Sequence, residues 1–180
     1  MTKNILNIAA VALVLFTLSG CFFNSEHPPI AFYDLQLPAK VQEQCKFRVV
    51  LVSNSTPSRT FMLYRQKNNQ ILQDEFNCWV QLPERMLMRY IAMAYPWGKN
   101  STIDTVEVQV TLTAFEFNAA DNAAVLAFNY RMNKALTNRT GSVIVREKVK
   151  ANTPEEFAAA MSRAAEKACK ELAAATAELK

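Results

Sequence analysis

The most constraining feature of this sequence is a run of strict alternation between residues 106 and 117. Every second position is apolar, first at Val106, Val108, Val110 and Leu112 and then, after a shift of one residue, at Phe115 and Phe117. A period of two predicts a half-buried β-strand, because successive side chains of a strand point to opposite faces. The shift of one residue predicts a β-bulge near Ala114.

Two more strands are expected to follow in a meander. Residues 118–122 have the composition of a turn, and alternating apolar residues from Ala124 to Met132 predict the partner strand. Residues 133–141 are expected to form a longer connection before a third strand marked by Val143, Val145 and Val149.

The preceding part of the chain also favours strands. Residues 30–38 alternate and end at Pro38, which predicts a half-buried strand, and residues 47–52 form an apolar run of the kind expected in a strand buried on both faces. Residues 61–66 and 70–76 predict a hairpin across Lys67-Asn68-Asn69, because Asn readily adopts a positive φ.

Two segments have helical periodicity. Residues 82–94 carry apolar side chains at spacings of three or four residues, which predicts a core-facing helix that ends before Pro96 and whose Met residues fill the core. Thr153 is the predicted N-cap of a second helix with an alanine-rich face, Pro154 at its first position and Glu156 closing a capping box. We therefore expect residues 30–180 to form one α+β domain, a mixed or antiparallel sheet with two main amphipathic helices packed on it.

The N-terminal 20 residues have the features of a secretory signal that is removed. Lys3 precedes an uncharged run from Ile5 to Phe16, which small residues and Cys21 follow. The alternative is a plain transmembrane anchor, but the run is shorter than the roughly 17–25 residues that a spanning helix needs.

Leu18-Ser19-Gly20-Cys21 resembles the bacterial lipobox. The resemblance implies cleavage before Cys21, a diacylated thiol and an acylated amino group, so that residues 21–29 become a lipidated tether and the lipid on Cys21 is the only bound group expected. Several acyl chains on one residue would hold the protein at a membrane stably. Phe22, in place of Asp, favours the periplasmic leaflet of the outer membrane by resemblance to the enterobacterial sorting rule.

Lipidation of Cys21 would leave Cys45, Cys78 and Cys169 in an oxidising compartment. At most one intramolecular disulfide can then form, and three pairings are open. We prefer Cys45–Cys78, because both residues flank strands of the same half of the chain, although the sequence does not settle the choice.

The residues that catalysis or metal binding would need are missing. The sole histidine, His27, lies in the tether, and there is no Cys-x-x-Cys or Gly-x-Ser-x-Gly motif. With 3 glycines a glycine-rich phosphate loop is excluded, and the net charge of +4 comes without a Lys/Arg block, which argues against nucleic-acid binding. We expect no enzyme, no metal and no cofactor site. Trp97, in a loop after a helix, either plugs that loop against the core or contacts a partner or membrane.

The order of several short motifs resembles one family. They are Phe32-Tyr33-Asp34-Leu35, the strand at 47–52, Met62-Leu63-Tyr64-Arg65, Asn69-Gln70-Ile71 and Phe76-Asn77-Cys78-Trp79, followed by the helix. This order is similar to the ABC-type transport auxiliary lipoproteins, the PqiC-like family, over most of the mature chain. Trp79-Val80-Gln81-Leu82-Pro83 and Ser58-Arg59-Thr60 depart from the usual pattern of that family.

The resemblance implies a non-catalytic outer-membrane lipoprotein that acts as the periplasmic adaptor of an ABC transporter. Its partner would be an MCE-type (mammalian-cell-entry) lipid-carrying protein, the cargo a phospholipid or another hydrophobic molecule, and the adaptor itself a homo-oligomer. Two alternatives are a carrier that holds acyl chains between residues 82–94 and the sheet, near Met86, Met93 and Phe115, and an assembly lipoprotein of a secretion or cell-wall machine.

Overall fold

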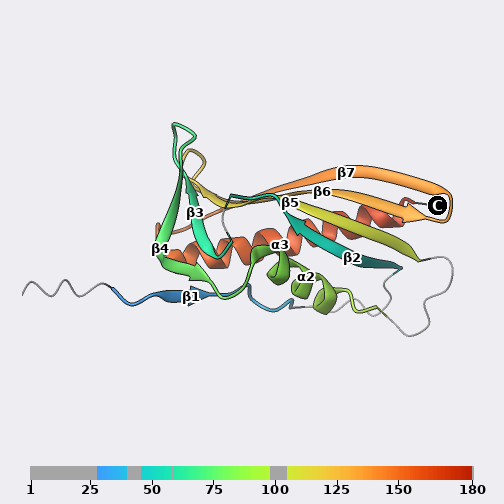
Figure 1. Ribbon diagram of the computed structural model, residues 1–180, viewed down its shortest axis with the longest axis horizontal. Helices are drawn as coiled ribbons and strands as arrows, with labels where there is room; N and C mark the ends of the chain where they lie inside the picture. The colour runs from blue at the N-terminus through green and yellow to red at the C-terminus, as the bar shows by residue number, and fades with distance from the viewer. Residues whose placement is uncertain (1–27, 40–45, 58, 98–104, 180) are drawn as a thin grey trace, which may run out of the picture.

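The structure, a computed structural model, describes residues 28–39, 46–57, 59–97 and 105–179 (Figure 1). The elements in chain order are β1 (Ala31–Tyr33), β2 (Phe47–Asn54), β3 (Phe61–Arg65), β4 (Ile71–Trp79), α2 (Pro83–Ala94), β5 (Val106–Asn118), β6 (Ala123–Lys134), β7 (Thr137–Lys148) and α3 (Pro154–Ala177). All strands belong to one mixed sheet, so the expected single-domain α+β fold is confirmed.

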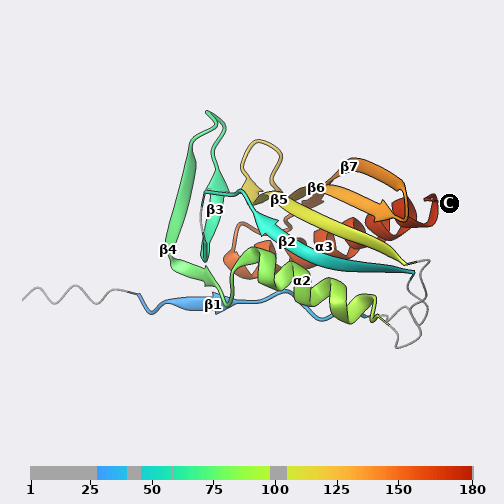
Figure 2. The ribbon, with the colours of Figure 1, turned by 45° about the vertical axis from the view of Figure 1, so that its right-hand side comes forward.

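The long strand β5 is the centre of the sheet. The strand order is β1-β4-β3-β5-β6-β7, and β2 pairs with β5 as well. Both β2 and β3 run parallel to β5: β2 pairs with it from Val106 to Leu112, and β3 joins it further on, through Tyr64–Phe117 and Arg65–Asn118. One edge of β5 is therefore shared by two strands, and β2 is the last described strand on that side (Figures 1 and 2).

The core lies between the sheet and the helices. The long helix α3 packs along β6 and β7, and α2 packs against β2 (Figure 2). Trp79 is 1% exposed, and its indole contacts the rings of Phe115 and Phe157 with centroids 4.9 and 5.5 Å apart. Burying a large apolar side chain of this kind stabilises a fold by about 1.5–3 kcal/mol.

Several local predictions are confirmed. The register between β5 and β6 shifts between Leu112 and Ala114, where the bulge was expected. Asn69 in the β3–β4 turn has φ 66°. Thr153 caps α3 by accepting the N–H of Glu156 on its side chain at 3.3 Å. The capping box is only half formed, however, because the N–H of Thr153 donates to the carbonyl of Ala151.

The expected long connection at residues 133–141 is wrong. The strand β6 runs on to Lys134 and β7 already begins at Thr137, so the two strands meet in a tight turn in which Ala135 has φ 48°. Residues 137–140 are exposed on both faces, because this end of the hairpin extends beyond the core. Without a buried face there is no alternation to reveal a strand in the sequence.

The predicted strand at residues 30–38 is shorter than expected. Only Ala31–Tyr33 pairs, with β4. Beyond it the backbone N–H groups of Leu35 and Gln36 donate to the side chains of Asp34 and Ser162, at 2.8 and 3.0 Å. Leu35 is buried and Leu37 is 66% exposed, so the second half of this segment is held by side-chain bonds and not by a sheet ladder.

The expectation that residues 47–52 are buried on both faces is also wrong. Among the described residues β2 pairs with β5 alone, and Val50 and Leu51 are 37% and 51% exposed. In α2, Met86 is buried as predicted, whereas Met93 is 39% exposed. The outer side of the β2–α2 pair consequently carries a concave surface among the described residues.

Candidate functional site

Only some of the residues predicted to carry chemistry lie among the described residues. Cys21 and Cys45 lie outside the described residues, so lipidation and the Cys45–Cys78 disulfide stay predictions. Cys78 on β4 and Cys169 on α3 are both buried and are not bonded to each other. Burial raises the pKa of the Cys78 thiol, with Asp74 adding to the effect, and raises the pKa of Cys169 to about 12. Neither thiol is prepared to act as a nucleophile, because the thiolate is the reactive form.

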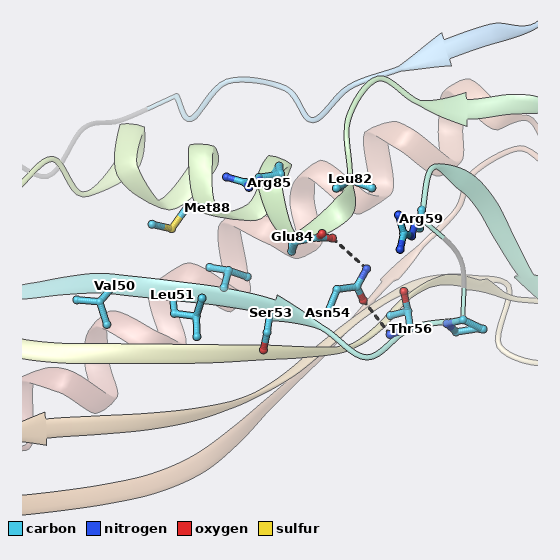
Figure 3. A pocket seen from close by; sticks show the side chains of 12 residues that line it. Val50, Leu51, Ser53, Asn54, Thr56, Arg59, Leu82, Glu84, Arg85 and Met88 are labelled. Atoms are coloured by element: carbon cyan, nitrogen blue, oxygen red, sulfur yellow. Dashed lines mark hydrogen bonds between the residues drawn. The ribbon is translucent and has the colours of Figure 1, made fainter.

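A groove of about 590 Å³ runs between the outer side of β2 and the first turns of α2 (Figure 3). The strand contributes Val50, Leu51 and Ser53 to its lining, and the helix contributes Glu84 and Met88. In Figure 3 the side chains of Glu84 and Met88 project from α2 toward β2. The groove lies where the helix packs on the face of β2, while β5 holds one side of the strand and no described strand pairs with its outer edge.

The far end of the groove is fixed by hydrogen bonds. Asn54, the last residue of β2, donates from Nδ2 to Oε2 of Glu84 at 3.0 Å and accepts the N–H of Thr56 on Oδ1 at 2.8 Å. Arg59 and Arg85 also line the groove and have no ion-pair partner among the described residues. Arg59 lies at this end of the groove (Figure 3), so the end presents a guanidinium with no ion-pair partner among the described residues, beside the carboxylate of Glu84.

The groove continues along β2 toward Trp97. A smaller hollow of about 90 Å³ is lined by Phe47, Val49, Ala92 and Trp97 among others, and Met88 borders both spaces. The guanidinium of Arg48 lies over the Trp97 ring, 4.9 Å from its centroid, a cation–π contact. Trp97 is 46% exposed, so of its two expected roles the structure favours a contact surface over a plug against the core.

The free edge of β2 gives this surface its chemical character. Residues Leu51–Asn54 pair with β5 on one side, and no described strand pairs with the other. A free edge presents backbone N–H and C=O groups that can bind another extended chain. The register shift at Val50 interrupts the edge, so the uninterrupted part is the one beside the larger groove. The sequence contains no signal for this groove, because an apolar run reads the same in a central strand and in an edge strand.

The remaining observations concern other kinds of site. Among the described residues no group of His, Cys, Asp and Glu could hold a metal, and no described helix is long and apolar enough to span a membrane. Met86 and Phe115, which the carrier alternative needs beside a lipid, are 0% and 1% exposed and fill the core. On the open face of the sheet a polar hollow of about 530 Å³ is lined by Gln109, Thr111, Asn129, Arg131 and neighbours.

Comparison with known proteins shows a shared fold. No protein-family model and no curated protein matches the sequence. Two solved structures are similar: a crystal structure of an uncharacterized protein, with a TM-score of 0.64 at 16% identity over 84% of this chain and 99% of that one, and the crystal structure of protein XCC0632 from Xanthomonas campestris, of the family DUF330, with a TM-score of 0.59 at 17% identity over 79% and 91%. At these identities the likeness concerns the fold alone.

Proposed function

We propose that this chain is a lipid-anchored, non-catalytic adaptor at the periplasmic leaflet of the outer membrane. In this proposal Cys21 carries the lipid, and the domain binds an MCE-type protein of an ABC transporter that moves phospholipids through the envelope. The lipobox-like motif and the resemblance in motif order support the anchor and the partner. A chain with the DUF330 fold and no recognisable catalytic motif is compatible with a binding role.

The observation that carries the proposal is the free edge of β2 beside the groove. An extended segment of a partner could pair its backbone with Leu51–Asn54, while its side chains contact Leu51 and Met88. Arg59 would favour an acidic residue or a chain terminus at that end of the segment, because a guanidinium binds carboxylates well. Exposed apolar side chains beside a free strand edge suit a protein partner better than a small polar ligand.

Site-specific crosslinking tests the adaptor role. A photoreactive amino acid in place of Leu51 should crosslink to the MCE-type protein in intact cells, and the same amino acid in place of Leu136 should not. Leu136 is the matched control because it is fully exposed, in the turn between β6 and β7. If the purified lipoprotein neither copurifies with nor crosslinks to an MCE-type protein, the proposal is wrong.

Substitution of the lipidated cysteine tests the anchor separately. Cys21→Ser should give a folded domain that is found in the soluble fraction and not in the membrane. A variant that stays membrane-bound with its N-terminal segment uncleaved would show that the segment is an ordinary transmembrane anchor. The two experiments are independent, because a lipidated protein can lack this partner.

A further inference from the structure

Two phenylalanines flank Cys78 on one face of the sheet. Phe32 of β1 is the register partner of Cys78 on one side, and Phe61 of β3 is its partner on the other. Directly paired residues on neighbouring strands point to the same face. Phe76 lies two residues before Cys78, and the regular pairing of Asn77 and Cys78 with β1 places it on this face. Val80 directly follows Trp79, the last residue of β4.

These residues form an exposed apolar surface that we call the aromatic face. It consists of Phe32, Phe61, Phe76 and Val80, together with Ile30, two residues before Phe32. Their exposed fractions are 65% for Phe32, 37% for Phe61, 36% for Phe76, 48% for Val80 and 56% for Ile30. Single exposed apolar residues are common, but a cluster on neighbouring strands marks an interaction surface.

The opposite side of the same strands forms the core. Trp79, next to Cys78, contacts Phe157 of α3, and so does Tyr64 of β3, with ring centroids 5.5 and 5.7 Å apart. The need to pack against α3 thus explains the apolar residues on that side. It does not explain Phe32, Phe61 and Phe76, which point the other way.

The position of the aromatic face indicates what covers it. Ile30 and Phe32 lie where the described chain begins, and Phe32 is eleven residues after Cys21, a distance of at most about 40 Å along an extended chain. In Figures 1 and 2 β1 and β4 lie at one end of the molecule, and the turn between β6 and β7 lies at the other. The aromatic face is therefore on the part of the fold that a lipid on Cys21 would hold nearest to the bilayer.

We infer that the aromatic face rests in the interface of the membrane that holds the lipid anchor, an inference that depends on the proposed lipidation of Cys21. None of its five residues is charged, so the contact is apolar and needs no anionic lipid. Amphipathic helices that lie in this interface bury their apolar face about 5–10 Å into the boundary between headgroups and acyl chains, and we expect a comparable depth for the aromatic face. Beside the lipid anchor, this second contact would fix the orientation of the domain, with the turn at Leu136 directed away from the bilayer.

Fluorescence quenching by brominated lipid tests this orientation. The full lipidated protein is reconstituted into neutral phosphatidylcholine vesicles that contain bromine on the acyl chains near the headgroup. Phe32→Trp and Phe61→Trp place an indole on the aromatic face, and Ile144→Trp is the matched control, since Ile144 is 56% exposed on β7 at the other edge of the sheet. The emission of Trp79 and Trp97 is subtracted with the unsubstituted protein.

The expected result is a blue shift and loss of emission for the indoles at positions 32 and 61, unchanged in high salt, and neither effect at position 144. If the protein floats with the vesicles but bromine quenches none of these variants, the anchoring stands and the inference about the aromatic face is overturned. A blue shift at position 32 without quenching would also overturn it, because another protein or a second copy then covers the face. If the protein does not float with the vesicles at all, Cys21 does not carry the lipid anchor, and both proposals are wrong.

Discussion

Asn54 at the end of β2 and Glu84 in the first turn of α2 are joined by a hydrogen bond from Nδ2 to Oε2 of 3.0 Å. Because Oδ1 of the same Asn54 accepts the N–H of Thr56, one side chain connects the strand to the helix and also sets the turn that follows. The two walls of the groove are therefore held together at the end where Arg59 lies.

Asn54→Ala should destabilise the protein because it removes both bonds at once. Net contributions are about 1 kcal/mol for a neutral hydrogen bond and about 1.5–3 kcal/mol for one to a charged group, so we expect a loss of about 1–3 kcal/mol in the free energy of unfolding. Urea denaturation measures it. Asn138→Ala, at an exposed position of β7, is the control and should stay within about 0.5 kcal/mol of the unsubstituted protein. Equal stability of the two variants would contradict the role given to Asn54.

Removing Arg65 from its ion pair with Glu116 should destabilise the protein far more than removing Glu116. The side chain of Glu116 is 6% exposed and that of Arg65 31%, and both guanidinium contacts go to this carboxylate. Arg65→Ala leaves a buried carboxylate without its partner, which costs about 3–5 kcal/mol. Glu116→Ala should cost less, because the guanidinium can turn toward water.

An exposed pair provides the comparison for this prediction. Arg48 and Glu107 form an ion pair at 2.5 Å with side chains 42% and 48% exposed, so Glu107→Ala should cost at most about 1 kcal/mol. Chemical denaturation of the three variants gives the order. Two residue pairs are all that joins β3 to β5 in the described part of the sheet, and we expect the Arg65–Glu116 ion pair to hold them together as well. If Arg65→Ala proved no more destabilising than Glu107→Ala, the ion pair would not have this role.

Gly141 is required by the ring of Tyr130, its register partner on β6. A Cβ at position 141 would lie 2.3 Å from the hydroxyl oxygen and 2.4 Å from Cζ of Tyr130. Tyr130 is 9% exposed and must leave its position to make room, so Gly141→Ala should cost about 1–3 kcal/mol by overpacking. In a Tyr130→Leu background the same change should cost much less, and a thermodynamic cycle measures the difference. Equal costs in the two backgrounds would show that the ring is not the obstacle.

Strong local patterns predicted the parts of the fold that are buried on one face. The alternation in β5 located the strand and its bulge, because one face of the strand is buried, and Thr153 with Pro154 located the start of α3, because the cap is a contact the local backbone makes by itself. The first half of β7 has no buried face and therefore no pattern. Glu116 lies among the buried residues of β5 because Arg65 arrives from a strand distant in sequence, which no local pattern can reveal.

The candidate site was harder to predict than the fold. Its groove depends on the parallel pairing of β2 with β5, for example Val52 with Val110, and on the absence of a described strand beyond β2. Neither follows from an apolar run alone. The phenylalanines of the aromatic face were visible in the sequence only as parts of strands, and their common face emerges from the register through Cys78.

Cys169 should make the stability of the protein sensitive to alkaline pH. Burial raises the pKa of its thiol from 9.0 to about 12, so the neutral form is favoured in the folded state. Its contribution to stability is complete below pH 9, because the unfolded thiol is then protonated too, and is lost as the pH rises from 9 toward 12. Tyr90, whose pKa burial raises from 10.0 to about 12, adds a similar loss at higher pH.

Cys169→Ala should therefore flatten the decline of the urea midpoint between pH 9 and 10, the range in which Cys169 is affected and Tyr90 is not yet. The same burial predicts that iodoacetamide leaves Cys169 unmodified in the native protein at pH 8 and alkylates it in urea, which mass spectrometry of tryptic peptides measures. The alanine variant will itself be less stable by the cavity it creates, so the slope with pH and not the absolute midpoint is the quantity to compare. Rapid alkylation of Cys169 in the native protein would mean that α3 opens at this position, and the alkaline loss of stability would then need another source.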